Sequence, residues 1–137
     1  MGSVDHVVLG ALVRDGQVLL AHRRADKRAF PGVWDLPGGV VEAGESEPAA
    51  LARELREELG VDVVPDAVSP LCRLRVEVTH GSALLSAWRV NAWRGTPTNG
   101  APDEHDDVRW FGVHELPPPV HPPVRAALLR AMTRGDG

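Results

Sequence analysis

The sequence has little cysteine and no long apolar run. Cys72 is the single cysteine among 137 residues, which excludes an internal disulfide and favours a reducing compartment. No apolar run approaches the roughly 18 residues that a membrane helix needs, and residues 1–6 lack the basic and apolar regions of a secretory signal. We therefore expect a cytoplasmic protein without a membrane partner.

The sequence also lacks an excess of positive charge. Its 15 Lys and Arg residues stand against 19 Asp and Glu, so the formal net charge is −4 and no polynucleotide partner is expected. Apolar residues make up 43% and charged residues 25%, which is ordinary for a soluble globular protein. Because the chain shows no internal repeat and no long linker, residues 1–137 are expected to form one domain.

A dense pattern fills residues 39–61, which read GVVEAGESEPAALARELREELGV. Written with U for an aliphatic residue, it is G-x5-E-x7-R-E-U-x-E-E-x-G-U, and every specified position is filled. At typical residue frequencies, such a match would arise by chance at roughly one start position in 10^9. Coincidence is therefore a poor explanation for the pattern.

Residues 46–59 are predicted to form one helix. Ser46 is a good N-cap, Glu47 falls in the first turn, Pro48 is early enough to be tolerated, and Gly60 can end the helix. One stripe of this helix should face the core, because leucine recurs at every fourth position, at Leu51, Leu55 and Leu59.

Three glutamates of this helix share one face. Glu54 lies three residues before Glu57 and four before Glu58, and like charges at these separations destabilise a helix. Arg53 can pair with Glu57, whereas a divalent cation would turn all three carboxylates into a ligand set. The alternative is a solvated acidic face, which is the usual meaning of a charge run.

The residues before the helix favour a metal site over an acidic surface. Residues 36–39 (LPGG) end an expected strand with two glycines, where backbone can approach a ligand closely and the Gly39 carbonyl can reach a metal. Hard cations such as Mg²⁺ are held by carboxylates together with substrate phosphates. The pattern thus predicts a site for a metal and a phosphate group.

Residues 39–61 resemble the Nudix box, the signature of the Nudix hydrolases, at every position of that motif. Residues 32–39 (GVWDLPGG) resemble the G-x-W-x-x-P-G-G approach to the box, and residues 93–97 and 104–110 resemble later strands of the MutT-like members. The resemblance implies an α/β/α sandwich with a mixed β-sheet. The order of the expected elements independently indicates an α+β fold.

Turn residues and alternating apolar residues divide the rest of the chain. Residues 14–16 are a hairpin signal, and residues 95–107 are rich in Gly, Pro, Asn and Asp, which predicts a mobile loop. The remaining expectations are strands at 7–13, 17–21, 33–36, 72–79, 83–93 and 108–111, a turn at 80–82, a rigid connector at 116–123 and a terminal helix at 124–133.

The resemblance implies hydrolysis of a phosphoanhydride by water, with Mg²⁺ as the cofactor and Mn²⁺ as the alternative cation. Glu54, Glu57, Glu58 and the Gly39 carbonyl would hold the metal, which neutralises phosphate charge and lowers the pKa of a bound water. Glu54 is the first choice for the general base, and Glu104 is its rival.

Glu45 and Arg53 are implied to orient the site. Arg23 and Arg24 follow the second expected strand, where they either reach phosphate oxygens or lie on the surface. Trp34 precedes the glycine pair and either stacks on a base or packs in the core.

Three further side chains have ambiguous surroundings. Glu104 lies in an acidic turn, but counting back from Trp110 places it where MutT-like members have an additional metal-binding glutamate. His105 is expected at the surface, because hard metals prefer oxygen ligands. The asparagine with which MutT-like enzymes read a purine is replaced here by His121 or is absent, which leaves selectivity for oxidised guanine open.

Three functions are compatible with these residues. The first is a MutT-like nucleoside triphosphate pyrophosphohydrolase, which would release a nucleoside monophosphate and pyrophosphate from nucleotides such as oxidised guanine nucleotides. The second is a Nudix hydrolase of a nucleotide sugar or another nucleoside diphosphate derivative, and the third is a non-catalytic nucleotide-sensing domain. The chain has no tyrosine, which diadenosine polyphosphate hydrolases of the family tend to have after the box. It is expected to be a monomer or a homodimer that binds a small nucleotide.

Overall fold

The computed structural model describes residues 5–27, 31–78, 81–112, 114–118 and 121–133. Within these ranges, no helix is both long and apolar enough to cross a membrane. The elements in chain order are β1 (Asp5–Arg14), β2 (Gln17–Arg23), β3 (Trp34–Asp35), β4 (Gly38–Val40), α1 (Glu47–Leu59), β5 (Asp62–Val63), the 3-10 helix η1 (Pro65–Ala67), β6 (Val68–Val78), β7 (Gly81–Val90), β8 (Trp93–Arg94), β9 (His105–Gly112) and α2 (Pro122–Thr133).

The main sheet is mixed, as the sequence predicts, and β1 lies at its centre. β1 runs parallel to β7, from the pair Asp5–Ala83 to the pair Leu12–Val90. Its other edge is shared by two antiparallel partners, β4 near the start of the strand and β2 near its end. β6 is antiparallel to β7, and β3 and β9 both pair with β2. A separate two-stranded sheet joins β5 to β8.

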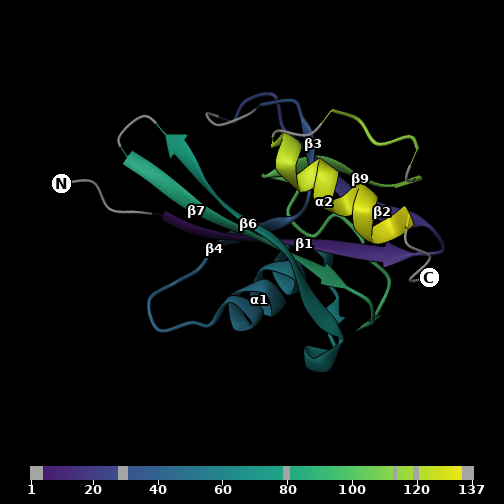
Figure 1. Cartoon of the computed structure of the whole chain (residues 1–137). Helices are drawn as coiled ribbons and strands as arrows, with labels where there is room; N and C mark the ends of the chain where they lie inside the picture. The colour runs from purple at the N-terminus through teal and green to yellow at the C-terminus, as the bar shows by residue number, and fades with distance from the viewer. Residues whose placement is uncertain (1–4, 28–30, 79–80, 113, 119–120, 134–137) are drawn as a thin grey trace.

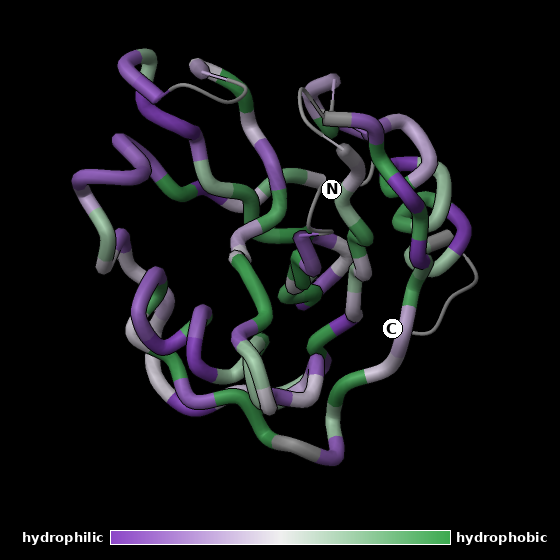
Figure 2. Tube along the Cα trace, turned by 90° about the vertical axis from the view of Figure 1, so that its left-hand side faces the viewer, coloured by the Kyte–Doolittle hydropathy of each residue, from purple (hydrophilic) through white to green (hydrophobic). Residues whose placement is uncertain are grey.

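The two helices cover opposite faces of the strands (Figure 1). Alternate residues of β1 enter two cores: Val8 and Leu12 pack with α1, and Leu9 and Ala11 pack with α2. Between them, Gly10 lets α1 come close, because a Cβ there would lie 2.8 Å from a methyl group of Leu51. Several of the most hydrophilic stretches lie along the outside of the molecule (Figure 2). The α/β/α sandwich and the α+β class are thus confirmed.

The hairpin of β1 and β2 and the helix α2 follow the sequence prediction closely. Asp15 and Gly16 form the predicted turn with φ values of 54° and 76°, the left-handed conformation that such tight hairpins need. The helix α2 begins two residues before the predicted position, at Pro122, and part of the connector lies outside the described residues. The turn predicted at 80–82 also lies partly outside them, since residue 80 is not described.

Two predictions about the chain after α1 need correction. The strand expected over 83–93 ends at Val90, and the Trp93–Arg94 pair belongs to the second sheet. The stretch 95–107 is not simply a mobile loop. Residues 105–107 begin β9, and the Thr98 and Gly100 backbone N–H groups bind the Leu59 and Glu58 carbonyls at the end of α1, at 2.9 and 2.7 Å. The reason is that orphan carbonyls at a helix end need donors, which this segment supplies.

Candidate functional site

The helix α1 has the boundaries that its sequence predicts. The Ser46 hydroxyl accepts a hydrogen bond from the Ala49 N–H at 3.2 Å, and Gly60, with φ of 72°, ends the helix by donating to the Arg56 carbonyl. The predicted leucine stripe is buried in the core cluster under the sheet, at Leu51, Leu55 and Leu59. The polar residues of α1 beside this stripe are thereby held in a fixed orientation.

Glu47, in the first turn of α1, is buried and anchors the helix to the sheet. Its carboxylate accepts hydrogen bonds from Trp88 Nε1 (2.9 Å), Ser86 Oγ (3.0 Å) and Arg73 (2.6 Å), and lies 2.5 Å from His6 Nε2. Burial raises the pKa of this carboxyl, but the hydrogen bonds from Trp88, His6 and Ser86 outweigh burial and hold it below its ordinary value. The sequence placed Glu47 in the helix but gave no sign of these partners.

Arg53 holds two of the predicted site carboxylates. Its guanidinium binds both oxygens of Glu45, at 2.8 and 2.9 Å, and donates to Glu54 Oε1 at 2.9 Å and to the Val40 carbonyl at 3.0 Å. The expected pairing of Arg53 with Glu57 is the looser contact, at 3.9 Å. The hydrogen bonds from Arg53 lower the pKa of Glu45 to about 2, so Glu45 is an anion at neutral pH.

Gly39 leaves the space that Glu54 occupies. A Cβ at this position would lie 2.5 Å from Glu54 Cδ and 2.6 Å from each carboxylate oxygen. Real Cβ atoms essentially never come this close to another heavy atom, and so no other residue fits here without moving Glu54. The space beside this glycine is thus filled by a side chain of α1.

Glu58 is a buried carboxylate beside Glu54. It is 7% exposed, and burial, followed by the neighbouring Glu54, raises its pKa well above the ordinary range. Its Oε1 atom has no hydrogen-bond partner in the described part of the chain. Two adjacent carboxylates with an unpaired buried oxygen are a donor set that suits a hard divalent cation, so these residues fit Mg²⁺.

The third glutamate of the predicted ligand set lies apart from this pair. The Glu57 side chain is 61% exposed. Among the described residues, no three His, Cys, Asp or Glu side chains converge in an arrangement that could hold a metal ion. The structure therefore brings Glu54 and Glu58 together, whereas Glu57 would have to turn inward to join them.

A cavity of about 250 Å³ lies beside the carboxylate pair. Its walls combine apolar side chains of β1 and β7 with polar residues from several loops and strands. Four of the predicted site residues line it, namely Arg23, Gly39, Glu104 and His121. Residues that are distant in the sequence therefore share one cavity with the glycine pair, Gly38 and Gly39, that lies next to α1.

The match to a family model decides which family the chain belongs to. A model of the NUDIX domain matches residues 4–132. The chain belongs to the Nudix hydrolase family. It is 42% identical over 111 residues to a Mycobacterium tuberculosis protein named putative 8-oxo-dGTP diphosphatase 2, covering 80% of this chain and 74% of that protein.

Two further comparisons place this Nudix hydrolase among the MutT-like members. An Escherichia coli protein named CTP pyrophosphohydrolase is 39% identical over 110 residues, covering 80% of this chain and 76% of that one. The crystal structure of a MutT NUDIX hydrolase from Burkholderia pseudomallei superposes with a TM-score of 0.82 at 30% identity, over 93% of this chain and 97% of the other. The predicted family and its MutT-like branch are confirmed.

Two predicted substrate-binding residues of this Nudix hydrolase do not line the cavity. Arg24 binds Asp26 through two hydrogen bonds, at 3.1 and 3.2 Å, on the surface. Trp34 packs edge-on against Phe111, with ring centres 4.9 Å apart, and the Arg109 guanidinium lies 5.3 Å from its ring. Both arrangements match the alternative that the sequence left open for each residue, a surface arginine and a core tryptophan.

Among the polar residues that line the cavity, Asp35 and His105 are two that were not foreseen as parts of the site. Asp35 lines the cavity, and burial raises its pKa to about 6, although the Leu36 N–H and Arg23 act in the opposite direction. His105 also lines it but is only 6% exposed, which corrects the expectation of a surface histidine. Neither side chain is part of a periodic pattern, so its surroundings become visible only when distant strands pair.

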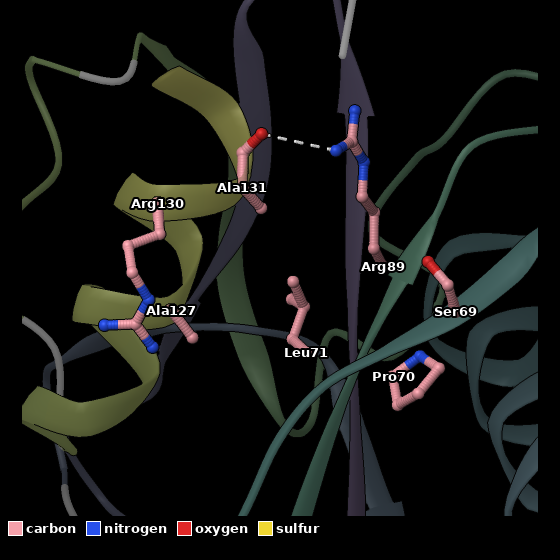
Figure 3. A pocket seen from close by; sticks show the side chains of 7 residues that line it. All are labelled: Ser69, Pro70, Leu71, Arg89, Ala127, Arg130 and Ala131. Carbon is pink, nitrogen blue, oxygen red and sulfur yellow. Dashed lines mark hydrogen bonds between the residues drawn. The ribbon is translucent and has the colours of Figure 1, made fainter. Parts of the chain in front are cut away.

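A second pocket of this Nudix hydrolase lies between β6, β7 and α2 (Figure 3). Its volume is about 270 Å³, and its lining includes Arg89 and Arg130 but no carboxylate. Arg89 reaches across it to the Ala131 carbonyl near the end of α2, at 3.4 Å. This pocket therefore offers no carboxylate to a cation, unlike the cavity lined by Glu104.

Proposed function

We propose that this Nudix hydrolase cleaves a phosphoanhydride of a nucleoside triphosphate in a Mg²⁺-dependent reaction, and releases a nucleoside monophosphate and pyrophosphate. The observation that supports this most directly is the position of the Glu54–Glu58 pair beside the cavity. Gly39, which contacts Glu54, and His105, which faces Glu58, both line that cavity. A nucleotide held there would have its phosphates next to the two carboxylates.

The glutamates of α1 and Arg53 have different roles in the proposed mechanism. Glu54 and Glu58, with Glu57 and the Gly39 carbonyl, would hold the cation, which supplies charge neutralisation and an activated water when bound. Arg53 fixes one oxygen of Glu54 by a 2.9 Å hydrogen bond and so orients this carboxylate. In phosphoryl transfer, positioning and charge stabilisation account for most of the rate.

Phosphate binding and proton removal fall to residues around the cavity. Arg23 lines the cavity and offers a cation to the phosphate oxygens, and Glu45 holds Arg53 from the other side. Glu54 is the proposed general base. Glu104, which lines the cavity and lies 3.7 Å from Lys27, is the rival for that role.

The names of the relatives favour a triphosphate over a nucleotide sugar. The Mycobacterium tuberculosis protein is named for 8-oxo-dGTP and the Escherichia coli protein for CTP, and both are nucleoside triphosphates. The two names differ in the base, so a test must include an oxidised purine and a pyrimidine.

A nucleotide panel with product identification tests the proposal. The protein would be incubated with Mg²⁺ and 8-oxo-dGTP, dGTP, CTP, dCTP and UDP-glucose, and the products would be separated by chromatography. We expect at least one triphosphate to give a monophosphate and pyrophosphate. Cleavage of the nucleotide sugar into two monophosphates, with the triphosphates untouched, would overturn the assignment. Tight binding without any turnover would instead indicate a sensing domain.

Substitutions in α1 test the assigned roles. Glu54→Gln and Glu57→Gln should each lower kcat by roughly 10²–10⁴-fold, the range for loss of a catalytic acid or base. Glu77→Gln, on an exposed position of β6, is the matched control and should keep full activity. If Glu104→Gln loses more activity than Glu54→Gln, the general base is Glu104. Near-normal activity in both α1 variants would refute the metal site itself.

A further inference from the structure

Two buried polar side chains face each other beside the cavity. Glu58 is 7% exposed and His105 is 6% exposed, and His105 Nε2 lies 3.7 Å from Glu58 Oε1. Glu58 Oε1 and the other ring nitrogen, His105 Nδ1, have no hydrogen-bond partner among the described residues. Unpaired polar atoms are rarely left buried, because their lost contact with water is costly. A small rotation of either side chain would bring Nε2 and Oε1 within hydrogen-bond distance.

His105 is held in this place by the segment that precedes it. The Gly100 N–H binds the Glu58 carbonyl at 2.7 Å, and the Asn99 side chain binds the His105 carbonyl at 2.7 Å. Gly100 lies so close to α1 that a Cβ there would be 2.8 Å from the Glu57 carbonyl oxygen. The last turn of α1 and the start of β9 are therefore clamped together, and the imidazole is fixed next to the Glu58 carboxylate.

The imidazole of His105 can supply the donor that Glu58 Oε1 lacks. A ring nitrogen that carries a hydrogen donates one hydrogen bond, and Nε2 lies 3.7 Å from Oε1. The charged groups around the ring are Glu104, Arg23, Lys27 and Asp106.

We propose that His105 is a positioning residue for the cation site, in which its Nε2–H binds Glu58 Oε1 and fixes the orientation of this carboxylate. This inference rests on the proposed role of Glu58 as a metal ligand. Residues that orient a metal ligand in this way commonly change metal affinity or activity by about 10–100-fold when they are replaced. His105 thus links the strand β9 to α1.

Metal binding without nucleotide tests the proposal separately from the reaction. Binding of Mn²⁺ alone would be measured by electron paramagnetic resonance for the wild type, His105→Phe and His105→Gln. His105→Phe should weaken Mn²⁺ binding by about 10–100-fold. His105→Gln, whose amide nitrogen can replace Nε2, should restore most of it. His114→Gln, at an exposed position, is the matched control and should bind like the wild type.

Kinetics and spectroscopy separate positioning from a merely structural role. In His105→Phe the Mg²⁺ concentration for half-maximal rate should rise, while the KM for nucleotide at saturating Mg²⁺ stays near the wild-type value. In the wild type, ¹⁵N spectra of the imidazole should show the Nε2–H tautomer. The His105 signals should shift on addition of Mg²⁺, and Glu58→Gln should abolish that shift.

Three outcomes would overturn the proposal. These are wild-type Mn²⁺ affinity in His105→Phe, equally weak binding in His105→Gln and His105→Phe, and an Nδ1–H tautomer in the wild type. If His105→Phe does not fold, the imidazole tautomer of the wild type and the Mn²⁺ affinity of His105→Gln test the proposal instead. Metal binding that depends on His105 in a protein that hydrolyses no triphosphate would sustain this inference and refute the proposed substrate.

Discussion

At the scale of single residues, the Glu54 carboxylate is positioned by one donor and one missing side chain. Arg53 binds its Oε1 at 2.9 Å, and Gly39 leaves the volume in which the carboxylate lies. The hydrogen bond from Arg53 fixes the direction of the carboxylate, and the missing side chain of Gly39 leaves room for it beside the cavity. Both are close in sequence to Glu54, which is why a short motif can specify the geometry.

Gly39→Ala should damage catalysis more than stability. The new Cβ would lie 2.5 Å from Glu54 Cδ and force this carboxylate to move. A displacement of about 1 Å at a catalytic group can lower the rate by about 10²-fold, so we expect a loss of kcat/KM of that order.

Gly16→Ala is the control, because its Cβ would meet nothing within 4 Å although its φ of 76° makes alanine strained. It should lower the urea midpoint and leave kcat/KM unchanged, whereas unchanged kcat/KM in Gly39→Ala would contradict the packing argument.

The Glu45–Arg53 pair should make stability depend on pH in the acid range. The pKa of Glu45 is lowered from 4.5 to about 2, so the folded state binds this proton less tightly than the unfolded state does. The stabilisation is therefore complete above the unfolded value and is lost as pH falls towards 2. Urea unfolding of the wild type and Glu45→Gln should differ at pH 7 and converge as the pH falls from about 4.5 to 2. A difference that is constant over this range would refute the assignment.

At the scale of elements, α1 is anchored at both ends by different means. Its start is tied to β6 and β7 through Glu47, and its last turn receives hydrogen bonds from Thr98 and Gly100. The leucine stripe between these ends packs on the sheet. The helix is therefore fixed in translation as well as in rotation, as a site built from its side chains requires.

Glu47→Ala should destabilise the protein by on the order of 3 kcal/mol, because it leaves the buried Ser86 donor and the half-buried Trp88 donor without their carboxylate. Urea unfolding followed by circular dichroism measures this change. Glu77→Ala, at an exposed position of β6, is the control and should stay within about 0.5 kcal/mol of the wild type. Equal urea midpoints for the two variants would show that the buried cluster contributes nothing.

The elements also show how far the sequence alone can reach. The signals that define α1 are local: a serine N-cap, leucine at every fourth position and a glycine after the last turn. They place the ends of the helix within one residue. The strand β4 has three residues and β8 has two, which are too short for any alternation to appear. The segment 95–107 was misjudged because its composition is that of a loop, while its order comes from donors that meet the end of α1. His105 was misplaced for the same reason.

At the scale of the whole molecule, β1 joins the two cores. One face of this strand packs with α1 and the other with α2, and Gly10 brings α1 against it. The strands β2 and β7 also place residues in both cores, so a disturbance on one side of the sheet reaches the other through shared strands. The cavity beside α1 depends on this arrangement, since β1 and β7 together form its apolar wall.

The chain should therefore unfold in one cooperative step. Trp88, Trp93 and Trp110 pack on the α1 side, and Trp34 packs on the α2 side. In Trp34→Phe, tryptophan fluorescence reports on the α1 side alone, whereas far-UV circular dichroism reports on both helices. We expect the two urea midpoints to coincide, as they do in two-state unfolding. Separate midpoints would mean that the two cores melt independently.

The parallel pairing of β1 with β7 has a consequence for the order in which the protein can be assembled during synthesis. The partner of Asp5 is Ala83, so the central sheet cannot close before β7 has left the ribosome. Non-local pairings of this kind slow folding and leave apolar surface exposed meanwhile. A chain that stops after residue 67 should be degraded by proteases that the whole protein resists. The glutamates of α1, neighbours in the sequence from the start, meet their cavity only after most of the chain has been made.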